Sequence, residues 1–167
     1  MPEQRVTAAQ RRAVVERAQG CCEYCRSQAR FAMQSFSVEH IIPRQAGGQT
    51  ALDNLALACQ GCNAHKYTKT EGFDPVSGEL VPLFHPRRQC WRNHFAWNAD
   101  FTLVTGLMPT GRATVNALQL NRAGLVSLRR VLYAMGEHPP AEPLDETENV
   151  PPELRGGISL ASAEKDR

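Results

Sequence analysis

The chain has 167 residues, of which 42% are hydrophobic and 22% charged, a length and composition that fit one ordinary domain with a packed core. Its apolar runs are far shorter than the roughly 20 residues that span a bilayer, and its polar first residues lack the apolar stretch of a secretion signal. These features argue against a membrane-spanning or secreted protein and predict a cytoplasmic one. The net charge of +2 conceals seven Lys or Arg against one Asp in residues 84–135, and eight acidic against three basic residues in 136–167. That pattern suits a polyanionic partner or a solvated basic face.

The first predicted element is a helix. Thr7 and Gln10 have the spacing of a capping box, which begins a helix that runs to about Gln19 and is ended by Gly20. We expect residues 1–20 to contribute this helix and little else.

Two pairs of cysteines with a two-residue gap follow, Cys22 with Cys25 and Cys59 with Cys62. Two such pairs can supply the four thiolates of a tetrahedral zinc site, which is redox-inert and leaves no open position for chemistry. Disulfides or reduced core cysteines are the alternatives, and the lack of a secretion signal disfavours disulfides. Cys21 competes with Cys22 as a ligand, but only Cys22 matches the spacing of the second pair. We therefore predict a structural Zn²⁺ bound by the two pairs.

Between the pairs, the composition of residues 31–42 is typical of a strand, with alternate residues up to His40 on one face. Pro43 and a Gly-Gly pair end that strand. A second short strand is expected at residues 55–57, and a helix from about Asn63 to Lys69 follows the second cysteine pair. The predicted order is strand, loop, strand, helix.

Beyond residue 70 the sequence predicts further small elements. They are a turn at 74–78, an extended piece at 80–84, an aromatic-rich stretch at 91–101, a helix at 112–120, and a last helix with Asn121 as N-cap and Gly136 as C-cap. From Pro139 on, prolines and acidic residues with few aliphatics predict a disordered tail. We expect a core at 21–70, an extension at 71–138 that packs on it, and a tail at 139–167.

Taken together, the motifs of the core resemble the HNH endonuclease family. They are Cys22-x₂-Cys25, Glu39-His40-Ile-Ile-Pro43, Gly47-Gly48, Asp53-Asn54-Leu55 and Leu57-Ala-Cys59-x₂-Cys62-Asn63-x₂-Lys66. The resemblance covers about residues 20–70, and residues 71–136 look like the extension found in a group of small bacterial HNH proteins. It implies an α+β fold with a ββα-metal nuclease core stabilised by the four-cysteine zinc site. It also implies one catalytic divalent cation, and DNA, expected to be double-stranded, as the substrate.

The resemblance also implies roles for individual residues. His40 matches the family's general base, and Asn54 matches the asparagine that holds the hairpin loop and so orients the base. Glu39 and Asn63 stand at the positions that ligate the catalytic metal in the family, although Asp or His is usual at the first and His at the second. The family's products carry 5′-phosphate and 3′-hydroxyl ends.

These residue types also suit phosphodiester hydrolysis on chemical grounds. An imidazole, with a reference pKa of about 6.5, can deprotonate water near neutral pH. The oxygens of Glu39 and Asn63 favour a hard cation, Mg²⁺ or Mn²⁺. Because Glu39 and His40 are neighbours on a strand, both can serve one site only if the strand bends or ends there. Lys66, one helical turn after Asn63, and Arg44, just after the strand, are candidates for phosphate contacts.

The unusual residues at positions 39 and 63 leave another interpretation open, a non-catalytic zinc-stabilised nucleic-acid-binding module whose nuclease site has decayed. A third is a nuclease that acts on RNA or as a toxin delivered to other cells. In either nuclease, the acidic tail could mask a basic groove, or it could be an inert solvating end.

Overall fold

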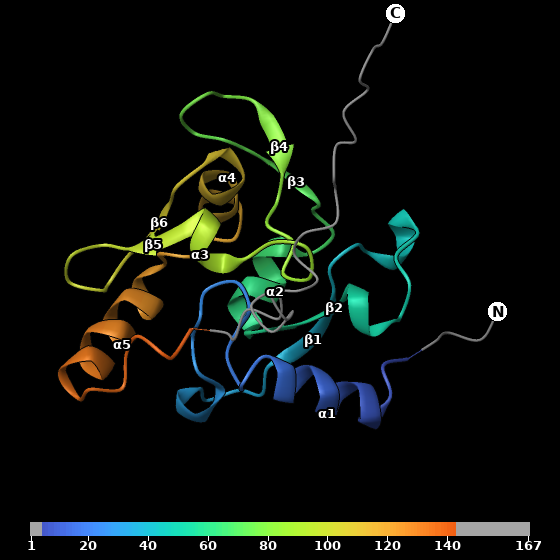
Figure 1. The fold of residues 1–167 in the computed structure, drawn as a ribbon, viewed down its shortest axis with the longest axis horizontal. Helices are drawn as coiled ribbons and strands as arrows, with labels where there is room; N and C mark the ends of the chain where they lie inside the picture. The colour runs from blue at the N-terminus through green and yellow to red at the C-terminus, as the bar shows by residue number, and fades with distance from the viewer. Residues whose placement is uncertain (1–4, 143–167) are drawn as a thin grey trace, which may run out of the picture.

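The computed structural model describes residues 5–142, in which helices alternate with three two-stranded antiparallel sheets (Figure 1). The predicted tail, residues 139–167, lies almost wholly outside the described residues. The suggestion that it masks a basic groove therefore concerns residues that are not described. Within residues 5–142, no helix has both the length and the apolar character that a membrane crossing requires.

The first helix, α1 (Ala8–Arg17), begins at the predicted capping box. The Thr7 side chain accepts a hydrogen bond from the Gln10 N–H, and the Gln10 side chain accepts one from the Thr7 N–H. The helix ends two residues earlier than predicted, because Gln19 already has a left-handed φ of 52°. Only Val14 of this helix is buried, so α1 is held largely by polar contacts. Arg17, for example, donates to the carbonyls of Leu52 and Leu55 at 2.8 and 2.7 Å.

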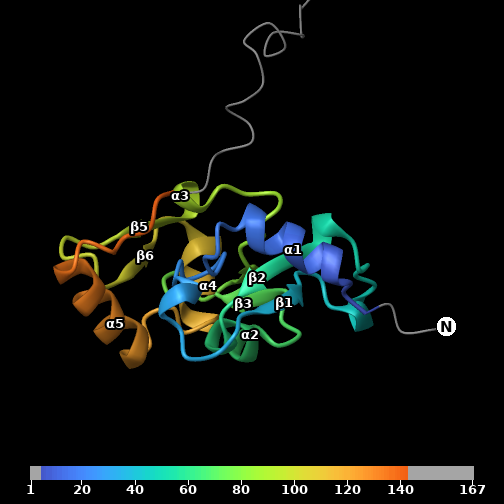
Figure 2. The ribbon, with the colours of Figure 1, turned by 90° about the horizontal axis from the view of Figure 1, so that it is seen from below.

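The central sheet pairs β1 (Ser37–His40) with β2 (Leu55–Ala58), with Glu39 opposite Ala56. Strand β1 is much shorter than the predicted 31–42. Its start is later because Ala29–Phe31 form a short 3₁₀ helix and pairing with β2 begins only at Ser37. It ends at His40 because the Asn54 side chain, rather than a paired strand, bonds both the N–H and the carbonyl of Ile42. All four residues of β2 are buried, since α1 and α2 lie on opposite sides of this hairpin (Figure 1, Figure 2).

Helix α2 (Gln60–Lys66) begins and ends three residues before the predicted helix. The second cysteine pair starts the helix rather than preceding it: Cys59 is the N-cap, and its sulfur accepts a hydrogen bond from the N–H of Cys62. The helix stops at Tyr67, whose φ of 48° and ψ of −113° are not helical. The order strand, loop, strand, helix is as predicted.

The remaining elements build a second layer beside this unit (Figure 1). They are β3 (Glu71–Phe73), β4 (Leu80–Pro82), α3 (Trp91–His94), β5 (Phe95–Trp97), β6 (Val104–Gly106), α4 (Pro109–Ala117) and α5 (Ala123–Ala134). Helix α4 starts earlier than predicted, with Pro109 in its first turn. The N-cap of α5 is Arg122 rather than the predicted Asn121, because the Asn121 side chain bonds both backbone groups of Val104.

One continuous core joins the two layers. Its buried members come from α1, the first cysteine pair, β2 and the later elements, and include Val14, Tyr24, Leu57, Phe95 and Leu120. An ion pair with a buried carboxylate adds to the second layer: the half-buried Arg112 of α4 donates twice to the Asp74 carboxylate, at 2.8 and 2.7 Å. The two cysteine pairs and the buried residues after residue 80 therefore belong to a single hydrophobic core.

Candidate functional site

The four predicted cysteines meet at one point. The sulfurs of Cys22, Cys25, Cys59 and Cys62 all lie within 4.8 Å of one another, and all four residues are buried. Cys25 and Cys59 have sulfurs 3.7 Å apart, close to the separation of about 3.8 Å expected for ligands of a tetrahedral ion with Zn–S of about 2.3 Å. Cys21 is not in the group, and its sulfur lies 3.7 Å from the Gln19 carbonyl. The geometry and the soft sulfur donors fit zinc, with Cys22 rather than Cys21 as the ligand.

The later part of the chain contacts the first cysteine pair at Glu23 and Tyr24, the two residues between the cysteines. Glu23 pairs with Arg87 and also accepts a hydrogen bond from the Leu57 N–H at 2.8 Å. The carbonyl of Tyr24 accepts a hydrogen bond from the indole of Trp91 at 2.9 Å. Buried contacts therefore fix this pair against both β2 and the second layer.

Arg122 approaches the second cysteine pair from the start of α5. Its guanidinium nitrogens lie 3.1 Å from the Cys59 sulfur and 3.6 Å from the Cys62 sulfur. Gly61 leaves room for it, because a Cβ at that position would lie 2.5 to 2.6 Å from the guanidinium. A tetrathiolate zinc site carries net charge −2, so a cation that donates to two of its sulfurs is well placed to stabilise it.

A separate open depression of about 370 Å³ lies where β1 ends and α2 passes. It brings together four of the predicted site residues: Glu39, His40, Asn63 and Arg44. Neighbouring strand residues can face one site only where the strand bends or ends. Glu39 and His40 meet this condition, because β1 ends at His40 and the chain bends directly after it. The remaining lining residues are Val38, Pro43, Gln45, Tyr67 and Thr68.

Glu39 is held from both sides by buried partners. The Tyr24 hydroxyl donates to Oε1, and Lys66 Nζ lies 3.0 Å from Oε2. Glu39 is 6% exposed and Lys66 2%. Burial raises the pKa of Glu39, while the charge of Lys66 and the hydrogen bonds from Tyr24 and Lys66 oppose that rise.

The position of Lys66 does not match the phosphate contact expected from the sequence. Its ammonium donates to the carbonyls of His40 and Ile41, at 3.3 and 2.9 Å, as well as to Glu39. A phosphate would have to displace these buried partners to reach it. The side chain folds inward because the carboxylate that pairs with it is itself buried.

His40 is half-buried, and its Nε2 lies 2.9 Å from the hydroxyl of Thr50. Thr50 is in turn bonded through its carbonyl to Gln10 of α1, at 3.0 Å. Burial first, and then the positive charges of Arg44 and Lys66, lower the pKa of His40. Both effects favour the neutral ring, which is the form that can accept a proton.

Asn54 closes the loop between β1 and β2. Besides its two bonds to Ile42, its side-chain amide donates to the Gln49 carbonyl at 2.9 Å. All of these partners are backbone groups of the loop that follows His40. Asn54 is buried and does not line the depression, so its contribution to the site is to fix the loop.

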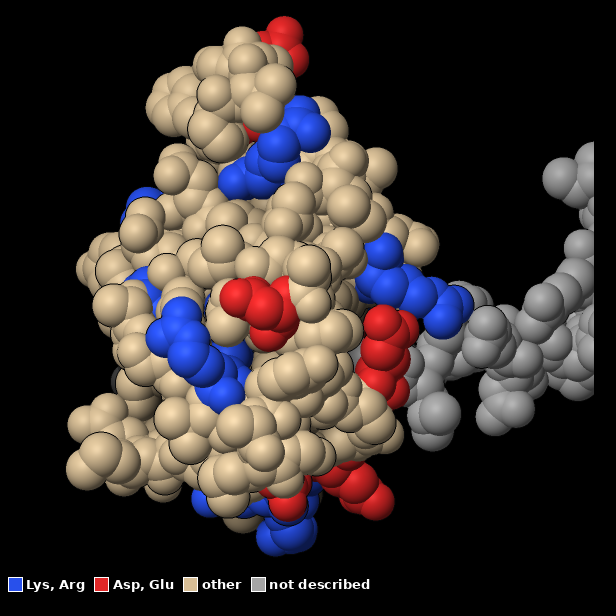
Figure 3. Space-filling model, turned by 90° about the vertical axis from the view of Figure 1, so that its left-hand side faces the viewer, with Lys and Arg blue, Asp and Glu red and all other residues tan. Residues whose placement is uncertain are grey.

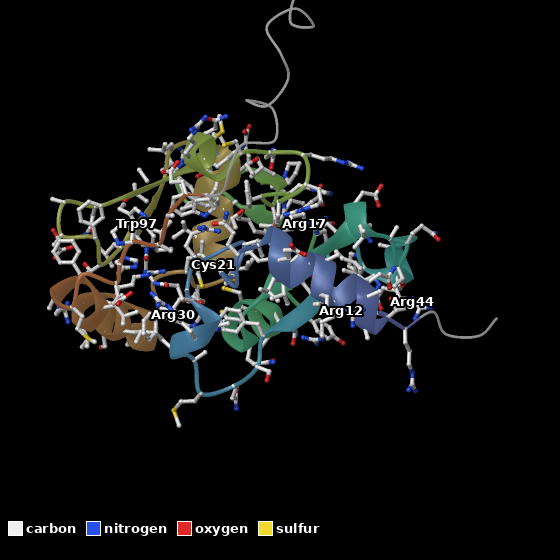
Figure 4. All side chains as sticks on the ribbon, turned by 60° about the horizontal axis from the view of Figure 1, so that its bottom comes forward. Arg12, Arg17, Cys21, Arg30, Arg44 and Trp97 are labelled. Carbon is white, nitrogen blue, oxygen red and sulfur yellow. The ribbon has the colours of Figure 1, made fainter. Side chains whose placement is uncertain are left out.

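The basic residues of the described chain lie at separate places in the views shown (Figure 3, Figure 4). Figure 4 shows Arg44 near one end of α1, at the side of the molecule away from Trp97. On the face at the left of Figure 1, Lys and Arg occur in separate small groups with acidic residues between them (Figure 3). Arg129 is 4% exposed and donates to the carbonyls of Leu120, Thr102 and Cys25, so this arginine of the basic stretch is structural.

Sequence reasoning missed three residues that touch the site residues: Tyr24, Thr50 and Arg122. Tyr24 carried a usable signal, since an aromatic residue between paired cysteines is close to the metal by necessity. Arg122 is 60 residues away from Cys62 along the chain, and nothing in the local sequence connects the two.

A first prediction concerns the choice between Cys21 and Cys22. Cys22→Ser should abolish zinc binding and destabilise the fold, because one of four ligands is lost from the buried cluster. Cys21→Ser should keep one zinc per chain, since its sulfur is outside the group. Elemental analysis of the purified proteins measures both, and zinc retained by Cys22→Ser but lost from Cys21→Ser would contradict the assignment.

A second prediction concerns Arg122. Arg122→Gln should weaken zinc binding by about 10-fold or more, the usual effect of losing a partner of a metal ligand. Gly61→Ala should act in the same direction, because its Cβ pushes the guanidinium off the sulfurs. Transfer of zinc to a chromogenic chelator measures the effect, with exposed Arg130→Gln as the matched control. Equal transfer from Arg122→Gln and Arg130→Gln would rule out a role for Arg122.

Comparison with known proteins identifies the central unit. Residues 22–69 match the family model described as HNH endonuclease. No curated protein and no solved structure matches the chain significantly. The matched range contains both cysteine pairs, β1, β2 and α2, and the family indicates nuclease activity and nucleic-acid binding in general. Residues 22–69 of this chain are therefore similar to the HNH endonuclease family, as the motifs of the core predict.

Proposed function

We propose that the protein is a metal-dependent endonuclease that hydrolyses phosphodiester bonds in double-stranded DNA, with β1, β2 and α2 as a ββα-metal nuclease core. The observation that carries the proposal is the single depression lined by Glu39, His40 and Asn63. A proton acceptor and two oxygen donors for a hard cation thus face one open space on a domain of a nuclease family.

His40 is the proposed general base. Its lowered pKa favours the neutral ring, which can take a proton from water as that water attacks phosphorus. Asn54 and Thr50 act as positioning residues, because the first fixes the loop after His40 and the second bonds the ring itself. The water's oxygen forms the new bond to phosphorus, and the 3′ oxygen leaves with the bonding electron pair.

Glu39 and Asn63 are the proposed ligands of the catalytic cation. Each oxygen of a carboxylate has two acceptor positions, and Tyr24 and Lys66 occupy only one on each oxygen of Glu39. The side-chain oxygen of Asn63 is a second hard donor. A cation bound there, with Mg²⁺ or Mn²⁺ as the expected identity, would neutralise charge on the phosphate and on the leaving oxygen.

Lys66 is better explained as a positioning residue for Glu39 than as a phosphate contact, since its ammonium is buried against that carboxylate. Arg44 is exposed on the rim of the depression and is the proposed phosphate contact. We propose that the extension, residues 71–138, serves the nuclease by holding the first cysteine pair through Arg87 and Trp91.

His40→Ala should reduce the initial rate of plasmid nicking in Mg²⁺ or Mn²⁺ by about 100-fold or more, because the proton acceptor is removed. His65→Ala, an exposed histidine of α2 that does not line the depression, is the matched control and should nick like the wild type. Equal nicking by the His40 and His65 variants would refute the assigned base.

Lys66→Met tests the two roles considered for this lysine. If Lys66 orients Glu39, the Mn²⁺ concentration for half-maximal cleavage should rise about 10-fold, while DNA affinity measured without a divalent cation stays unchanged. Tyr24→Phe, which removes only the other hydrogen bond to Glu39, should shift the Mn²⁺ dependence in the same direction.

Exposed Lys69→Met is the control for charge alone. Zinc content and melting temperature establish that each variant is folded. Weaker DNA binding by Lys66→Met with an unchanged Mn²⁺ requirement would instead support the phosphate contact.

A further inference from the structure

Tyr67 occupies a backbone position that normally requires glycine. The N–H of Lys69 bonds the carbonyl of Lys66 at 2.8 Å, which closes a four-residue turn with Tyr67 as its first central residue. Its φ of 48° and ψ of −113° are those of that position in a type II′ turn. The position is dominated by glycine because a Cβ is strained there.

Nothing within the described protein compensates for this strain through the side chain. Tyr67 is 77% exposed, so its ring adds little to the core. Among residues 5–142, its hydroxyl has no hydrogen-bond partner. Packing and polar contacts within the described residues therefore do not explain why a tyrosine stands at this turn.

Tyr67 lies on the wall of the depression that contains the proposed catalytic residues. Tyr67 lines the same depression as Asn63 and His40, and its N–H bonds the Asn63 carbonyl at 2.9 Å. The turn thus places an exposed tyrosine next to the proposed metal ligand. Strained residues persist where the surrounding structure holds them for a function.

We propose that Tyr67 stacks on an unpaired base of the substrate strand, at or beside the phosphodiester that is cut. This inference rests on the proposed nuclease function and refines its substrate: within double-stranded DNA, the preferred cutting sites are those at which the cleaved strand is locally unpaired. In a fully paired duplex the faces of each base are covered by its neighbours, and a flat ring can stack only on a base that has left the stack. Arg44 on the same rim supplies a charge for the backbone of that strand.

The test uses proteins that all carry His40→Ala, so that DNA is not cut. It compares Tyr67→Gly and Tyr67→Phe in this background with the protein that keeps Tyr67, called the wild type below. Fluorescence anisotropy without a divalent cation measures binding to three probes of equal length: a single strand, a duplex with one mismatch, and a fully paired duplex. Phe73→Ala, which changes an exposed aromatic residue that does not line the depression, is the matched control.

Tyr67→Gly should bind the single strand and the mismatched duplex about 5- to 100-fold more weakly, the usual effect of losing one stacked ring. Its affinity for the fully paired duplex should change little, and Tyr67→Phe should bind like the wild type. The melting temperature of Tyr67→Gly should rise by about 2–4 °C, because glycine relieves the strained turn. Weaker binding together with higher stability is a combination that a purely structural residue does not produce.

Equal losses on all three probes would overturn the inference, as would unchanged binding or a fall in melting temperature. In those cases the wild type still binds DNA, so the proposed function stands. If the His40→Ala protein that keeps Tyr67 binds none of the probes, the proposed function fails, and the role of Tyr67 fails with it.

Discussion

Four sulfurs from two distant parts of the chain hold this domain together. Cys59 and Cys62 join the end of β2 to the start of α2, while Cys22 and Cys25 connect the chain after α1 to the same point. A sheet of two four-residue strands is not stable alone, so this small unit needs a further constraint, which a metal bound by the four sulfurs can supply. Zinc binding, coupled to deprotonation, can supply about 10 kcal/mol or more to such a fold.

The same cluster sets the geometry of the depression. Tyr24 lies between the two cysteines of the first pair, and its hydroxyl reaches the Glu39 carboxylate. Lys66 lies four residues after Cys62 and holds the other oxygen. The carboxylate proposed to bind the catalytic cation is therefore oriented from both cysteine pairs, and a buried charge is balanced by a buried partner. His40 is fixed independently, through Thr50, by α1 and the loop that Asn54 closes.

Much of this arrangement could be predicted from local sequence. The grouping of the two cysteine pairs and the order strand, loop, strand, helix each depend on patterns of neighbouring residues, and the structure confirms them. The end of β1 could not be predicted, because the Asn54 side chain takes over the hydrogen bonds of Ile42 from 12 residues away, and the strand starts six residues later than predicted. The inward position of Lys66 and the contact of Arg122 with the sulfurs likewise depend on tertiary packing. Charge counts also misled at Arg129, a basic residue that is buried for backbone hydrogen bonds.

The most direct test of the account is anomalous diffraction from crystals soaked in Mn²⁺, recorded at the zinc and manganese absorption edges. The account predicts a zinc peak at the centre of the four cysteine sulfurs. It also predicts a separate manganese peak between the Glu39 carboxylate and the Asn63 side-chain oxygen, in the depression that His40 lines. Manganese found elsewhere, or a depression without manganese beside an occupied zinc site, would contradict the proposed catalytic centre.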